Sequence, residues 1–164
     1  MSDSMQRLAV TSTTFADGAR LPLSMAFDPS TGGSNRSPQL AWTPGPSGTK
    51  SYAITCFDPD APTTVGWWHW LLFDIDPQIV ELAEGAGAPG AQPPGSVHGY
   101  TDFGFSGFGG MAPPPGDPPH HYLFNVYALD KKIGLTETAT GAYVMFSIRG
   151  AVLAQGRITG TYSQ

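Results

Sequence analysis

The sequence predicts a mostly β fold that is rich in loops. Glycine (21 residues) and proline (16 residues) are abundant in this chain of 164 residues, and both residue types are typical of turns and of fixed backbone angles. Apolar residues make up 40% of the chain and charged residues only 13%. Several short segments also carry the β-branched and aromatic side chains that strands favour. Together these observations favour a β architecture over a helical bundle.

The clearest strands are predicted in the centre of the chain. Ser51 to Phe57 is rich in strand-favouring side chains and stops at Asp58-Pro59. Trp67 to Ile75 is almost continuously apolar between Gly66 and Asp76-Pro77, which is typical of a strand buried on both faces. Further strands are predicted at Leu8–Thr13, Gln39–Trp42, Tyr122–Leu129 and Arg157–Tyr162.

One helix is predicted near the carboxyl end, from Tyr143 to Gln155. Glycines at 141 and 156 flank this segment as boundaries. The residues that recur at helical spacing are Val144, Ile148, Val152 and Gln155.

A long ordered loop is predicted between Ala88 and Pro119. This segment contains eight of the 16 prolines, and four aromatic residues can anchor it to the core, namely Tyr100, Phe103, Phe105 and Phe108. Long ordered loops usually serve a function. The three phenylalanines offer two interpretations: an interface for a homodimer, or rings that pin the loop to the core.

Length and charge limit the class of protein. We expect a single domain over residues 1–164. The formal net charge is -5, and all eight Lys and Arg residues lie outside residues 51–130, which disfavours binding of nucleic acid or of an anionic membrane through a basic face. The chain has one cysteine, no secretory pattern at its amino end and no apolar run of about 18 residues. A cytoplasmic location is therefore predicted.

Two motifs carry the candidate chemistry. The first is Asp58-Pro59-Asp60-Ala61-Pro62, a turn stiffened by proline, followed by Trp67-Trp68-His69-Trp70 on the next strand. The second is Pro113-Pro114-Pro115-Gly116, which leads to His120-His121-Tyr122 at the start of another strand. Both place carboxylate, imidazole or phenol groups on stiff backbone. Taken separately, each histidine is more often structural than ligand-binding.

Together, these motifs resemble those of the phosphatidylethanolamine-binding proteins, also called Raf kinase inhibitor proteins. The resemblance extends from about Ser37 to Tyr162, and the short step from Asp60 to Trp67 resembles the bacterial branch. It implies a Greek-key β-sandwich of antiparallel sheets with a C-terminal helix. It also implies a small pocket at one end, where phosphate, phosphorylethanolamine or a similar lipid headgroup binds.

The resemblance also implies which residues form the pocket. The polar wall is expected to contain Asp58, His69, His120 and Tyr122, and the apolar wall Trp67 and Pro114, with Asp60 as a neighbour that stabilises the turn. His121 stands where the family usually has arginine. Since residues 51–130 have no Lys or Arg, imidazole N–H groups, the Tyr122 hydroxyl and backbone N–H groups are expected to hold the anion. Its affinity is then predicted to rise as the pH falls.

The predicted function is binding of a small anionic ligand without catalysis or a cofactor. There is no nucleophile elbow, and Cys56 lies inside a predicted strand. Two alternatives remain open. One is a regulator that inhibits a partner such as a kinase or protease. The other is a metal-dependent enzyme using Asp58 with two histidines, with His98 or His121 as a further ligand. Against the enzyme, consecutive residues on a strand, such as His120 and His121, point to opposite faces.

Overall fold

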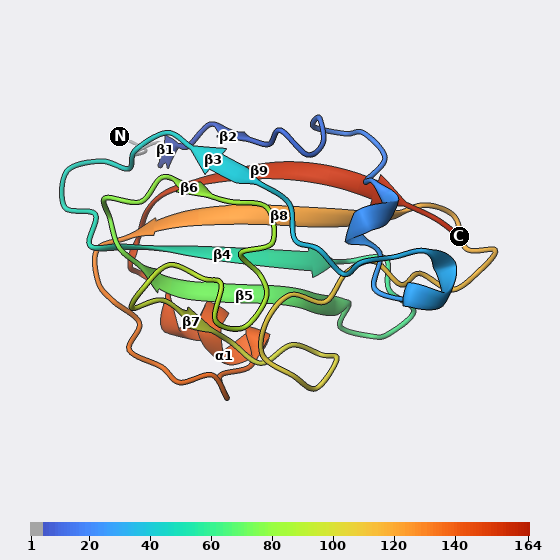
Figure 1. Cartoon of the computed structure of the whole chain (residues 1–164). Helices are drawn as coiled ribbons and strands as arrows, with labels where there is room; N and C mark the ends of the chain where they lie inside the picture. Colours follow the sequence, from blue (N-terminus) through green and yellow to red (C-terminus); the bar gives the residue numbers. More distant parts are fainter. Residues whose placement is uncertain (1–4) are drawn as a thin grey trace.

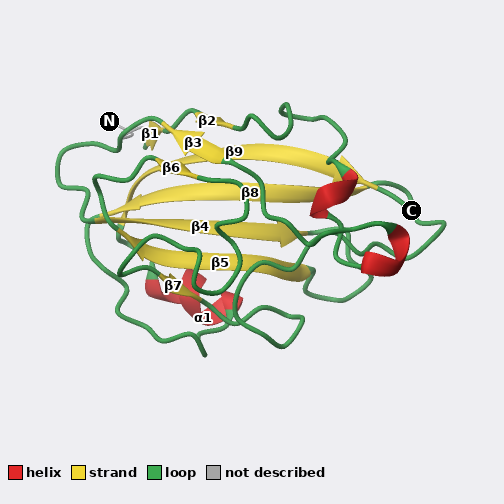
Figure 2. Cartoon of the chain, viewed as in Figure 1, coloured by secondary structure: helices red, strands yellow, loops and turns green. Residues whose placement is uncertain are grey.

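The computed structural model describes residues 5–164 and contains two β-sheets and one short α-helix (Figures 1 and 2). The large sheet has the strand order β1-β9-β8-β4-β5-β7, and the small sheet has the order β2-β3-β6. Neighbouring strands are antiparallel except β1 and β9, which are parallel. The elements are β1 (Gln6–Arg7), β2 (Val10–Thr11), β3 (Leu40–Trp42), β4 (Ser51–Asp58), β5 (Trp67–Ile75), β6 (Glu81–Leu82), β7 (Val97–His98), β8 (His120–Leu129), α1 (Gly141–Ser147), β9 (Val152–Tyr162) and two 3₁₀ turns, Leu23–Met25 and Pro29–Thr31.

The centre of the large sheet, at strands β4 and β5, is buried on both faces. Alternate residues of β5 belong to two separate apolar clusters: Trp70 and Leu72 pack in the larger one, which the small sheet covers, and Leu71 and Phe73 pack in the other with α1. Figure 2 shows α1 beside β5 and β7, on the side away from the small sheet. The prediction of a mostly β sandwich, with β5 buried on both faces, is confirmed.

The predicted helix from Tyr143 to Gln155 is wrong in its second half. Helix α1 ends at Ser147, and Gly150 then turns the chain with a φ of 80°. From Val152 onward the chain is β9, which pairs with β8. Its buried positions alternate with period two, but two of them, Gly156 and Gly160, have no side chain to reveal that pattern. Hydrogen bonding to a central strand therefore outweighs a coincidental helical spacing.

The predicted strand from Leu8 to Thr13 is longer than the strand that forms. Within this range only Val10–Thr11 (β2) is a strand, and β1 (Gln6–Arg7), which precedes it, belongs to the other sheet. Leu8 lies between them and is buried in the core, so the chain crosses from one sheet to the other at this residue. Two-residue strands of this kind are too short for an alternating pattern to show in the sequence.

The three phenylalanines of the long loop pack inward, whereas Tyr100, the fourth predicted anchor, is exposed. Phe108 is buried in the larger core cluster, and Phe103 and Phe105 each stack on Phe27, with ring centroids 4.6 and 6.2 Å away. These contacts favour rings that pin the loop over rings that form an interface. Association into a homodimer remains a prediction.

Three strands bring the two sequence motifs to one end of the large sheet. Strand β4 ends there, while its antiparallel neighbours β5 and β8 begin there, with Asp58 opposite Trp67 and Phe57 opposite Leu123. In Figure 1 this is the end near the carboxyl terminus of the chain. Segments that are more than 60 residues apart in sequence thus contribute side chains to one place.

None of the helices within residues 5–164 combines the length and apolar character needed to cross a membrane.

Candidate functional site

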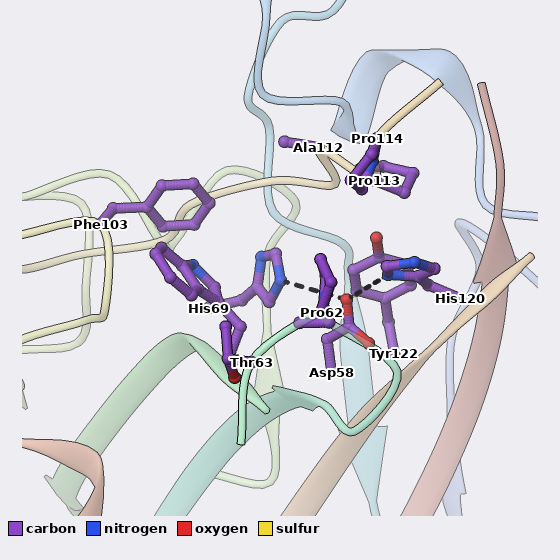
Figure 3. Close-up of a pocket in the computed structure, with 12 residues that line it drawn as sticks. Asp58, Pro62, Thr63, His69, Phe103, Ala112, Pro113, Pro114, His120 and Tyr122 are labelled. Carbon is purple, nitrogen blue, oxygen red and sulfur yellow. Dashed lines mark hydrogen bonds and ion pairs between the residues drawn. The ribbon is translucent and has the colours of Figure 1, made fainter. Parts of the chain in front are cut away.

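A cavity of about 230 Å³ lies at this end of the sheet. Six of the seven site residues predicted from the sequence line it, and Asp60 does not. The lining residues are Asp58, Ala61, Pro62, Thr63, Trp67, His69, Phe103, Ala112, Pro113, Pro114, His120 and Tyr122. Figure 3 shows that they come from opposite sides, with the proline wall facing the polar residues of the sheet.

The turn between β4 and β5 holds Asp58 in place. One carboxylate oxygen of Asp58, Oδ1, accepts a hydrogen bond of 2.8 Å from the backbone N–H of Asp60, as aspartates at turns commonly do. Gly66 closes the turn with a φ of 69°, and a Cβ atom there would lie 2.4 Å from the Phe57 ring. Glycine is therefore required at that position, and the other oxygen of Asp58, Oδ2, faces His120.

His120 is bonded to a carboxylate at each ring nitrogen. Nδ1 lies 2.7 Å from Oδ2 of Asp58, and Nε2 lies 3.0 Å from Oδ2 of Asp117. Burial by itself lowers the pKa of His120, but the hydrogen bonds to the two carboxylates outweigh it and raise that pKa above its usual value. Both nitrogens then donate, and His120 is an imidazolium enclosed by acidic groups.

His69 has the opposite electrostatic character. Its Nδ1 lies 2.7 Å from the carbonyl oxygen of Gly109 and 3.1 Å from that of Gly110. Burial lowers the pKa of His69, because it outweighs the opposing effects of these carbonyls and of Asp58. The remaining nitrogen, Nε2, lies 4.0 Å from Oδ2 of Asp58.

The loop that fixes His69 also depends on glycine. The backbone N–H of Gly109 donates back to the carbonyl of His69 at 2.8 Å, so the two segments hold each other. At Gly110 a Cβ atom would lie only 1.8 Å from the carbonyl oxygen of Met25. Only glycine allows this approach, which brings the two carbonyls to the imidazole.

Two hydrogen-bond donors in the cavity wall are buried and have no partner within residues 5–164. They are the hydroxyl of Tyr122 and the indole N–H of Trp67. Burial raises the pKa of Tyr122 far above its usual value, and the charge of Asp58 adds to that effect, so the hydroxyl keeps its proton. In Figure 3 it points across the cavity toward Pro113 and Pro114.

The apolar side of the cavity includes a residue that the sequence analysis did not assign to the site. Phe103 packs edge-on against both Trp67 and His69, with ring centroids 5.4 and 5.2 Å apart. The aromatic composition of the loop pointed to anchoring, and nothing in the sequence indicated that one ring lines a pocket. Asp117 was also missed, because its role follows from a contact with His120.

Asp60 and His121 form a second pair outside the cavity. Oδ2 of Asp60 accepts from both the backbone N–H and Nδ1 of His121, each at 2.7 Å. Burial by itself raises the pKa of Asp60, but the hydrogen bonds from His121 and the nearby histidines together outweigh it and lower that pKa. His120 is buried and His121 exposed, as expected for consecutive residues on a strand.

The metal-enzyme alternative finds no support in the part of the chain that the structure describes. Residues 5–164 contain no cluster of three or more His, Cys, Asp or Glu side chains placed to hold a metal ion. His98, considered as a further ligand, instead accepts a hydrogen bond of 3.2 Å from the indole N–H of Trp70. The only cysteine, Cys56, is buried, and burial raises its pKa.

A β-sandwich with a small, mostly apolar end cavity and a few buried polar groups has the architecture of a ligand-binding protein. Comparison with known sequences identifies the family. The sequence profile described as phosphatidylethanolamine-binding protein matches residues 11–163, and the chain belongs to this family.

The relatives include bacterial proteins of similar length. The chain is 43% identical to UPF0098 protein YbcL of Escherichia coli, over 93% of this chain and 86% of that protein. It is 42% identical to UPF0098 protein YbhB of the same organism, over 93% and 98%. The crystal structure of E. coli YbcL, described as a new member of the mammalian PEBP family, has a TM-score of 0.92 and covers 96% of this chain and 99% of that one. A homologue from Chlamydia trachomatis has a TM-score of 0.83 at 29% identity, with coverage of 97% and 99%.

Proposed function

We propose that the cavity binds a small anion that carries a phosphate group, such as phosphate, phosphorylethanolamine or a lipid headgroup. The observation that supports this most is the pair of buried donors, the Tyr122 hydroxyl and the Trp67 indole N–H, which have no partner within residues 5–164. An unpaired buried donor costs about 1–3 kcal/mol, and an anion oxygen in the cavity removes that cost. Family membership supports a binding role as well.

Asp58, His69, His120 and Pro114 complete the proposed site. His120 contributes a positive charge that offsets the carboxylate of Asp58, and the prolines form a stiff wall opposite the polar residues. We assign Asp60 to support of the turn and of His121. No catalytic step is part of the proposal.

Calorimetric titration with inorganic phosphate tests the site. In Tyr122→Phe the hydroxyl is lost and the ring is kept, so phosphate affinity should fall by about tenfold, as expected for one hydrogen bond to a charged group. Tyr143→Phe is the matched control, because Tyr143 is exposed on α1. Equal affinity of Tyr122→Phe and the parent protein would remove Tyr122 from the proposed site.

An untested alternative function is inhibition of a partner kinase or protease by a protein with the same cavity. A pull-down that recovers one stoichiometric protein partner would favour it.

A further inference from the structure

The polar atoms of the cavity divide into donors and acceptors. Carbonyl oxygens only accept hydrogen bonds, so Nδ1 of His69, which faces the carbonyls of Gly109 and Gly110, must carry the hydrogen. Nε2 of the neutral ring is then an acceptor. The burial that lowers the pKa of His69 keeps the ring in this form at neutral pH. The imidazole of His69 therefore offers the cavity a lone pair and not an N–H group.

His120 offers no free N–H group to a ligand either. Its two ring nitrogens already contact Oδ2 of Asp58 and Oδ2 of Asp117. The cavity wall thus presents two acceptors, Nε2 of His69 and Oδ2 of Asp58, which lie 4.0 Å apart. This differs from the expectation that histidine N–H groups hold the anion. The unpartnered donors of the lining residues are instead the Tyr122 hydroxyl and the Trp67 indole N–H.

A ligand must match both kinds of group at once. An oxygen that carries hydrogen and lies about 2.8 Å from both acceptors fits their separation, and it can donate to either one. An anion with acceptor oxygens alone would place its lone pairs against Asp58 and His69. The charges nearby do not offset this repulsion, because the positive His120 is paired with two carboxylates, Asp58 and Asp117.

We propose that the cavity selects anions that carry their own hydrogen, namely phosphate monoesters and inorganic phosphate, over phosphodiesters and sulfate. The P–O–H group donates to Asp58 or His69, and the other phosphate oxygens accept from Tyr122 and Trp67. A phosphate monoester has a second pKa of about 6 and keeps a P–O–H group in part of its population near neutral pH. An intact phospholipid is a phosphodiester and has none. This inference rests on the proposed function.

Two ligand pairs, one matched in size and one matched in charge, test the selection in the unmodified protein. At pH 6.5, calorimetry should show inorganic phosphate binding at least about tenfold more tightly than sulfate, and methyl phosphate more tightly than dimethyl phosphate by a similar factor. Sulfate matches phosphate in size, and dimethyl phosphate matches the monoanion in charge. Equal affinities within both pairs overturn the selection and leave the proposed function intact. Absence of binding by all four anions contradicts the proposed function itself.

A zwitterionic ligand provides a second test, because an ammonium group could also donate to the two acceptors. Phosphorylethanolamine, a monoester, should bind about tenfold more tightly than glycerophosphoethanolamine, a diester with the same ammonium group. Equal binding would mean that the acceptors hold the ammonium, and the selection for P–O–H would be wrong.

Two variants with the same charge change locate the selection in the cavity wall. Asp58→Asn and Asp117→Asn each remove one negative charge beside His120, but only Asp58 lines the cavity. The ratio of phosphate to sulfate affinity should fall about fivefold or more in Asp58→Asn and stay within about twofold of the parent in Asp117→Asn. Equal ratios in the two folded variants would assign the selection to net charge. If Asp58→Asn does not fold, the ligand pairs still decide the question.

Discussion

Two aspartate–histidine pairs lie at the start of strand β8. One lines the cavity, and the other is on the outer surface. Asp58 with His120 and Asp60 with His121 have the same separation of 2.7 Å between nitrogen and oxygen. The side chains of the first pair are each 4% exposed, whereas those of the second are 40% and 55% exposed. Water screens the outer pair and leaves it little net energy. The inner pair has lost its water, so each charge depends on the other.

The comparison shows why contact distance alone does not identify a functional residue. The two pairs look alike in the sequence, because each combines an aspartate of the same turn with a histidine at the start of the same strand. What separates them is the strand alternation that turns His120 inward and His121 outward. If burial gives the two pairs different roles, variants of the inner pair should change stability and ligand binding more than variants of the outer pair.

The largest effect is expected from removing the inner carboxylate. Asp58→Ala leaves the imidazolium of His120 in a buried place with only the partly exposed Asp117 as partner, so the free energy of unfolding should fall by about 3 kcal/mol. It also removes the acceptor for the backbone N–H of Asp60. Urea denaturation measures the change, and a loss below about 1 kcal/mol would place the inner pair on a level with a surface pair.

Replacing the inner histidine should weaken ligand binding. In His120→Ala the charge of Asp58 has no positive partner in the cavity wall, so phosphate affinity should fall by about 1.5–3 kcal/mol. Calorimetry measures the affinity, and circular dichroism confirms that the variant is folded. The matched outer variant, His121→Ala, should bind phosphate like the parent. Unchanged affinity in His120→Ala would exclude His120 from the site.

The inner pair should also give stability a characteristic pH dependence. Because the folded pKa of His120 is raised above the unfolded value of about 6.5, its contribution is fully present below pH 6.5 and is lost as the pH rises through the folded pKa. The loss is about 1.4 kcal/mol for each pH unit between the two pKa values.

His69 and His98 have lowered pKa values and shift the total stability in the opposite direction, so the comparison must isolate His120. The difference in unfolding free energy between the parent and His120→Gln should therefore be largest near pH 6 and shrink toward pH 9. A difference that is constant from pH 6 to 9 would contradict the raised pKa.

The smallest effect is expected at the outer pair. Asp60→Ala removes hydrogen bonds to the exposed His121. The melting temperature should fall slightly, because the free energy of unfolding decreases by less than about 1 kcal/mol. Phosphate affinity should not change. The lowered pKa of Asp60 makes this contribution present above pH 4 or so and lost as the pH falls through the folded pKa. A variant as stable as the parent but unable to bind phosphate would reverse the roles assigned to the two pairs.

The sequence by itself determined the strands whose ends and burial are indicated by neighbouring residues. Strand β5 was predicted with its correct ends, because Gly66 and Asp76-Pro77 enclose a run that is apolar on both faces. Strand β4 was predicted to within one residue, since Pro59 follows it. The motif residues that line the cavity were found by resemblance to a known family. That resemblance could be recognised because the motif residues are close together in the sequence, beside proline-rich turns.

The tertiary structure alone decided the features that depend on distant partners. Strand β9 pairs with β8 along its length, and its glycines admit Leu8 and Leu21 at close range, which a local pattern cannot reveal. The hydrogen positions of His69 and His120 likewise depend on Gly109, Gly110, Asp58 and Asp117. The type of a side chain decides which titratable and hydrogen-bonding groups it has. Its charge and its role as donor or acceptor are set by the partners that the fold brings within hydrogen-bonding distance.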